Sequence, residues 1–93
     1  MKEIEIFYLK NCPYCKNARK AIEELQEAEP AYRDVQIKWI DENQEQDLAA
    51  ARDYWHVPSI FYGEKKLYEA DPGQDYDTIK ANVLAAFQTV TGK

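Results

Sequence analysis

The chain has 93 residues, enough for one domain and not two, and we expect a single domain over residues 1–93. A hydrophobic fraction of 45% is typical of a globular protein, and a net charge of −5 argues against nucleic acid and anionic membrane surfaces as partners. No apolar run could span a bilayer, and no secretory signal is visible at the N-terminus. We therefore expect a cytoplasmic protein and a monomer.

The first third of the chain predicts a strand followed by a helix. Residues 3–9 alternate in the manner of a largely buried strand. Pro13 suits the first position of a helix, because its missing N–H would have no intrahelical partner there. An apolar stripe at helical spacing then runs on and stops before Pro30. The stripe consists of Ala18, Ala21, Ile22 and Leu25.

The middle of the chain predicts a second strand over residues 35–40 and, after a turn at 41–43, a second helix. Asn43 is expected to cap this helix, with Gln46 three residues further on. The residues expected to face inward are Leu48, Ala51 and Trp55, and Trp39 on the strand is also expected to pack.

The last third predicts a β-hairpin and a final helix. Strands over 59–62 and 66–69 flank a turn at 63–65, and a helical stripe follows a loop. The order βαβαββα implies an α/β fold, since a strand–helix–strand start gives a parallel pair and the hairpin adds antiparallel strands. We expect a four-stranded mixed sheet flanked by three helices. The final stripe consists of Tyr76, Ile79, Val83, Phe87 and Val90.

The two cysteines of the chain, Cys12 and Cys15, are better explained by chemistry than by architecture. A bridge between them closes too small a loop to stabilise much of the chain. Cys12 is expected at the start of the helix, where the N–H of Cys15 and the helix dipole favour a thiolate. Lys10 and Lys16 add stabilising positive charge nearby. A thiolate at Cys12 attacks disulfides, and Cys15 is then placed to attack the mixed disulfide.

The two cysteines also have other interpretations, as metal ligands or as a redox sensor. Structural zinc needs four ligands and only His56 remains to help, so we expect no metal site. A redox sensor, or a metal or iron–sulfur carrier that uses Cys12 without turnover, stays open as an alternative. His56 itself is open between a role in proton transfer and an exposed position without function.

The stretch Cys12-Pro13-Tyr14-Cys15 matches the active-site motif of glutaredoxins, and Val57-Pro58 resembles the second signature of that family. With the element order and the spacing, the resemblance covers almost the whole chain. It implies a thioredoxin-like fold and a thiol–disulfide oxidoreductase with no bound cofactor. Its substrates would be disulfide-containing proteins or small disulfides.

The resemblance also assigns roles to single residues. It implies Cys12 as nucleophile and Cys15 as resolving thiol. Pro58 is expected to be cis and to lie against the cysteines, while the backbone of Val57 pairs with an extended substrate segment. Tyr14 is a further candidate for substrate binding, because an aromatic side chain at the start of the helix can pack on a substrate at the rim.

The chain departs from the family where glutathione would bind. Glutathione-dependent members usually carry a Gly-Gly pair after the hairpin, whose amides approach the tripeptide closely. This chain has Tyr68 and Glu69 there, and Glu69 is expected to direct a like charge toward a ligand carboxylate. Lys10 also lies one position nearer the cysteine than the usual lysine. Glutathione and a thioredoxin-reductase-like flavoenzyme are the two candidate electron donors, and these departures weigh against glutathione.

Overall fold

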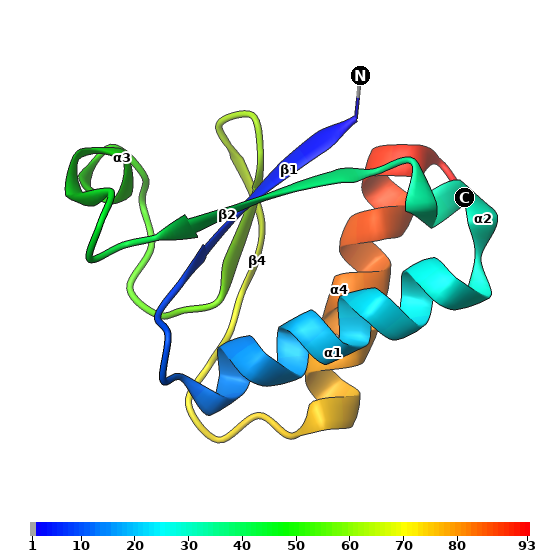
Figure 1. Cartoon of the computed structure of the whole chain (residues 1–93), viewed down its shortest axis with the longest axis horizontal. Helices are drawn as coiled ribbons and strands as arrows, with labels where there is room; N and C mark the ends of the chain where they lie inside the picture. The colour runs from blue at the N-terminus through cyan, green and yellow to red at the C-terminus, as the bar shows by residue number, and fades with distance from the viewer. Residues whose placement is uncertain (1) are drawn as a thin grey trace.

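Four strands form one mixed sheet in the order β2-β1-β3-β4 (Figure 1). The structure, a computed structural model, describes residues 2–93. The central strand β1 (Glu3–Tyr8) pairs in parallel with β2 (Gln36–Asp41) and antiparallel with β3 (Ser59–Tyr62). The hairpin partner of β3 is β4 (Lys65–Glu69). The parallel pair and the antiparallel hairpin are those expected from the sequence.

Helices cover both faces of the sheet. The two long helices, α1 (Pro13–Ala28) and α4 (Tyr76–Thr91), pack side by side on one face (Figure 1). The short α3 (Gln46–Ala50) lies on the other face. None of the helices in the described part of the chain combines the length and the apolar character that a membrane crossing needs.

One helix, α2 (Pro30–Arg33), was not expected from the sequence. Glu29 is extended, as residues before proline usually are, so α1 ends there as expected. Pro30 then suits the first position of a new turn, and the Glu29 carboxylate accepts from the N–H of Ala31 over 3.1 Å. The structure therefore has four helices in place of three, and the fold class is the one predicted.

Two apolar clusters lie on the two faces of the sheet because successive side chains of a strand point to opposite faces. Ile4 and Ile6 of β1 belong to the large cluster, which α1 and α4 cover. Phe7 belongs to the small cluster with Ile40 and Phe61, covered by α3 and by the ring of Tyr54. Both clusters meet at β1 and β3. The strand β1, which leads to the two cysteines, therefore lies between two apolar layers.

The second predicted helix is shorter than expected, and its predicted cap is wrong. Glu45, not Asn43, occupies the N-cap position of α3. Asn43 lies in the preceding turn, where its N–H donates to the buried carboxylate of Asp41 over 2.9 Å. The carboxylate at the end of β2 therefore organises a turn that delays the helix by about two residues.

The inward face predicted for this segment is wrong as well. Leu48 is 37% exposed, Ala51 is exposed, and Trp55 is 86% exposed. The reason is that α3 ends at Ala50, so helical spacing does not carry through to Trp55, and Tyr54 packs on the sheet instead. Trp39, by contrast, is half-buried as expected, with the guanidinium of Arg19 4.0 Å from its ring centroid.

Candidate active site

Cys12 lies at the N-cap position of α1. Its backbone is extended, with φ of −92° and ψ of 118°, and Pro13 follows at the start of the helix. The N–H of Cys15 donates to Cys12 Sγ over 3.3 Å, as it would to an N-cap oxygen. Negative charge on this sulfur is stabilised by that N–H and by the positive end of the helix. The local geometry is the one that the sequence predicted.

Cys15 differs from Cys12 in its surroundings. Both thiols are free, but Cys15 is 5% exposed while Cys12 is only half-buried. Burial raises the pKa of Cys15 to about 12, and its hydrogen bond with Cys12 and the charges of Cys12 and Glu42 act in the same direction. Cys12 is therefore the more accessible of the two thiols, and Cys15 stays protonated behind it.

The two lysines expected to stabilise a thiolate lie at the same end of α1. Lys10 and Lys16 are exposed and line, with Cys12, a shallow depression of about 240 Å³. Over residues 2–93, neither ammonium group donates a hydrogen bond to the thiol. Any effect on the thiolate acts through solvent and is weakened by salt. Their stabilising role stays a prediction.

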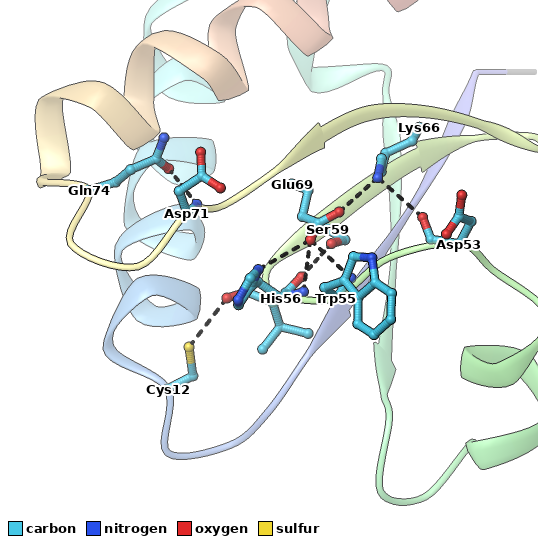
Figure 2. Close-up of polar contacts among 10 residues, drawn as sticks. Cys12, Asp53, Trp55, His56, Ser59, Lys66, Glu69, Asp71 and Gln74 are labelled. Carbon is cyan, nitrogen blue, oxygen red and sulfur yellow. Dashed lines mark hydrogen bonds and ion pairs between the residues drawn. The ribbon is translucent and has the colours of Figure 1, made fainter.

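The segment before β3 lies against Cys12. The Val57–Pro58 peptide bond is cis, as expected, and Pro58 is buried. The thiol of Cys12 donates to the carbonyl oxygen of Val57 over 3.7 Å (Figure 2). The carbonyl of Pro58 accepts from the N–H of Ala70 over 3.0 Å, which ties this segment to the end of β4. Two parts of the chain 45 residues apart thus meet at one sulfur.

Tyr14 holds the loop between β4 and α4. Its hydroxyl accepts from the N–H of Gly73 over 2.7 Å. In the same loop, Oε1 of Gln74 accepts from the N–H of Asp71 over 3.2 Å and from the hydroxyl of Tyr68 over 2.5 Å. Two main-chain donors of this loop are therefore already bonded within the chain.

A groove of about 260 Å³ passes beside Val57. Its lining is mainly apolar and includes Tyr14, Trp55 and Pro72. The structure thus places Tyr14 and Val57 on one surface, and it adds Trp55, which the sequence had placed in the core. The roles of Tyr14, Val57 and Pro58 in substrate binding stay predictions.

Glu69 is a residue of the site that sequence reasoning misplaced. Its Oε2 accepts from the N–H groups of Trp55 and His56, each over 2.9 Å, and its Oε1 pairs with Lys66 Nζ over 2.7 Å (Figure 2). Although burial acts to raise it, these hydrogen bonds lower the pKa of Glu69 to about 2. Lys66 also donates to the carbonyl of Asp53 over 3.2 Å. One ion pair therefore holds the main chain just before Val57.

The expectation that Glu69 directs its charge toward a ligand is therefore wrong. Its side chain is 14% exposed and its charge is balanced by Lys66. No pattern in the sequence could have shown this, since the N–H groups that Glu69 binds lie 13 and 14 residues earlier.

His56 faces the same carboxylate. Its Nδ1 lies 3.4 Å from Glu69 Oε2, and its side chain is 49% exposed. Among the described residues, no hydrogen bond joins its ring to Cys12. Within residues 2–93, no group of three or more His, Cys, Asp or Glu side chains is placed to hold a metal ion.

The family model for glutaredoxins matches residues 4–67. The chain belongs to the glutaredoxin family. This family of thiol–disulfide oxidoreductases accounts for the two cysteines at the start of α1. No curated protein matches the sequence at a significant level.

Solved structures similar to this glutaredoxin-family chain share its fold. A mutant thioredoxin from Halobacterium salinarum NRC-1 superimposes with a TM-score of 0.60 at 25% identity, covering 96% of this chain and 74% of that one. A malarial protein gives 0.59 at 17% identity, with 88% and 92% covered. The protein Trxlp from Edwardsiella tarda gives 0.57 at 13% identity, with 87% and 80% covered. The thioredoxin-like fold expected from the sequence is confirmed.

Proposed function

We propose that this protein is a dithiol oxidoreductase that reduces protein or small mixed disulfides, with Cys12 as nucleophile and Cys15 as resolving thiol. The observation that carries the proposal is the difference between the two thiols. Cys12 accepts a main-chain N–H at the rim of the fold, while Cys15 is buried with its pKa raised to about 12. The reducing cytoplasm is the compartment in which such a pair is returned to the thiol form between cycles.

In the first half-reaction, the Cys12 thiolate attacks one sulfur of the substrate disulfide. A bond forms between Cys12 Sγ and that sulfur, the substrate S–S bond breaks, and the other substrate sulfur leaves as a thiolate that takes a proton. The N–H of Cys15 stabilises the attacking charge before the bond forms. Lys10 and Lys16, at the same end of α1, would add positive charge that favours the thiolate form of Cys12.

In the second half-reaction, Cys15 attacks Cys12 Sγ and releases the second substrate thiol. Cys15 gives its proton to solvent or to the departing thiolate, and the protein is left with a Cys12–Cys15 disulfide. Formation of the mixed disulfide removes the negative charge on Cys12, which is one of the causes that raise the pKa of Cys15. Attack by Cys15 is therefore favoured only after substrate is bound covalently.

Substrate would pair with the backbone of Val57 and pack on Pro58 and Tyr14. The support for this assignment is that the main chain before Pro58 is held next to Cys12 by bonds to Glu69 and Ala70. A pre-formed extended segment can add a polypeptide by main-chain hydrogen bonds without first being ordered.

A thioredoxin-reductase-like flavoenzyme, rather than glutathione, is the electron donor we propose. The N–H groups of Asp71 and Gly73 are bonded to Gln74 and Tyr14, so a ligand carboxylate would have to displace those side chains. The charge of Glu69 does not weigh against glutathione, because Lys66 balances it.

The test gives the oxidised protein glutathione with glutathione reductase, and separately thioredoxin reductase, and follows NADPH consumption with insulin as substrate. We expect turnover with thioredoxin reductase and little with glutathione. Fast turnover with glutathione alone would overturn the donor assignment. No turnover with either donor, together with no acceleration of insulin reduction by dithiothreitol, would overturn the function.

A matched pair of variants sharpens the donor assignment. Gln74→Ala removes the acceptor of the Asp71 N–H, and we expect it to raise turnover with glutathione several-fold. Gln88→Ala removes an exposed amide near the other end of α4 and should leave the turnover unchanged.

A further inference from the structure

Trp55 is the most exposed large hydrophobic side chain that the structure describes, with 86% of its surface accessible. Aromatic side chains carry a large part of the binding energy at protein interfaces. An exposed indole is available to contribute such energy when a partner binds. In Figure 2 it lies beside His56, on the side away from Cys12.

The backbone that carries this indole is held rigidly. The N–H of Trp55 donates to Glu69, and the carbonyl of Asp53 accepts from Lys66, which pairs with the same carboxylate. Tyr54, between them, packs on the small apolar cluster, with its ring centroid 5.0 Å from that of Phe7. A side chain on a fixed backbone binds with less loss of conformational entropy than one on a mobile loop.

The indole also lines a groove beside the segment that faces Cys12. It lines the groove of about 260 Å³ together with Val57, whose carbonyl faces the thiol of Cys12. A polypeptide paired with Val57 advances about 3.3 Å per residue, so the side chains next to its cysteine lie along the groove that the indole lines.

The charge around the groove limits what can occupy it. Glu42 lines the groove, and the exposed Asp71 follows Ala70, another lining residue. The net charge of −5 also repels an acidic peptide that approaches the groove. The groove is therefore suited to an apolar side chain and opposes an acidic one.

We propose that Trp55 is a specificity-determining residue, whose indole binds an aromatic or branched aliphatic side chain within two residues of the cysteine in a polypeptide disulfide. The inference rests on the proposed function, because it concerns the substrate of the Cys12 reaction. The indole contributes to binding of the polypeptide and takes no part in the exchange of sulfur bonds.

The experiment uses the pre-reduced protein in single turnover, which removes any dependence on the electron donor. Its substrates are symmetrical disulfides of short peptides with Phe, Leu, Ser or Glu within two residues of the cysteine, and hydroxyethyl disulfide, which has no side chain. The peptide thiol released after acid quench is measured by chromatography.

We expect the Phe and Leu peptides to react about tenfold faster than the Ser peptide at low concentration, with the Glu peptide slowest. Trp55→Ala should reduce the preference to less than about twofold by raising the half-saturating concentration, while the limiting rate and the rate with hydroxyethyl disulfide stay unchanged. The main-chain bond to Glu69 survives this change.

Two further variants serve as controls. Trp55→Phe should keep most of the preference, and Tyr62→Ala, at an exposed aromatic residue at the end of β3, should leave it unaltered. Equal discrimination in the parent and in Trp55→Ala, or no discrimination in the parent, would overturn this inference alone. Failure of the parent with hydroxyethyl disulfide as well would overturn the proposed function.

Discussion

The two walls of the candidate site are held in different ways. The start of α1 is built by contacts within four residues, such as the N–H of Cys15 to Cys12 Sγ. The facing segment, residues 53–57, is held by Glu69 and Lys66 of β4, which lie 13 or 14 residues further along the chain. The geometry around Cys12 thus depends on one helix start, while the surface opposite it depends on the tertiary fold.

This difference separates chemistry from recognition. Changes at the start of α1 should affect which sulfur reacts and leave the fold intact. Changes at Glu69 should affect stability and the shape of the groove, and leave the thiols unaltered. The following predictions test that separation, beginning with the largest expected effect.

Replacing either cysteine tests the asymmetry at the start of α1. Cys12→Ser should reduce disulfide reduction to the background rate, because the accessible sulfur is lost. Cys15→Ser should still attack and should accumulate a mixed disulfide at position 12, detectable by mass spectrometry of the intact protein. Trapping at Cys15 in the Cys12→Ser variant would contradict the assigned roles.

The buried thiol should be almost inert until the protein unfolds. In the Cys12→Ser variant at pH 8, we expect iodoacetamide to alkylate Cys15 at least about 100-fold more slowly than an unfolded cysteine, because burial, the largest cause that raises the pKa of Cys15, remains in this variant. The same sample in guanidinium chloride is the control and should react at the ordinary rate. Similar rates in both would show that Cys15 is not shielded.

The opposite wall should lose stability without its carboxylate. Glu69→Ala should lower the free energy of unfolding by about 2 kcal/mol at pH 7, measured by urea denaturation, because the N–H groups of Trp55 and His56 lose a charged acceptor. Glu64→Ala removes an exposed carboxylate from the nearby hairpin turn and should cost little. Alkylation of Cys12 should be equally fast in both variants.

The same contribution should depend on pH. The pKa of Glu69 is lowered from 4.5 to about 2, so its stabilisation is complete above pH 4.5 and is lost as the pH falls toward 2. The difference in free energy of unfolding between the parent and Glu69→Ala should therefore be constant near pH 7 and shrink below pH 4.5. A difference that persists at pH 2 would mean that packing, not charge, holds residues 53–57.

The smallest effect is expected at the loop that Tyr14 holds. Tyr14→Phe removes one hydrogen bond to the N–H of Gly73 and should lower the free energy of unfolding by about 1 kcal/mol or less. Amide hydrogen exchange at Gly73 should become faster, which NMR can follow. Tyr62→Phe, at an exposed ring, should change neither quantity.

Much of the fold followed from local patterns. The sequence predicted the alternation of β1, the stripes of α1 and α4, and the end of α1 before Pro30, because each depends on residues a few positions apart. The prediction for residues 43–55 was wrong because it relied on the same local spacing. The buried carboxylate of Asp41 and the packing of Tyr54 on Phe7 shorten its helix, and both are contacts that spacing does not show.

The sequence by itself determined the setting of Cys12, since Cys12, Pro13 and Cys15 specify an N-cap through backbone geometry that four residues suffice to define. Only the tertiary structure decided what faces Cys12. The carboxylate of Glu69, expected to repel a ligand, instead binds the main chain before Val57 and leaves the indole of Trp55 on the surface. The physical reason is that a partly buried carboxylate needs hydrogen-bond donors, and the fold supplies two of them from a segment distant in sequence.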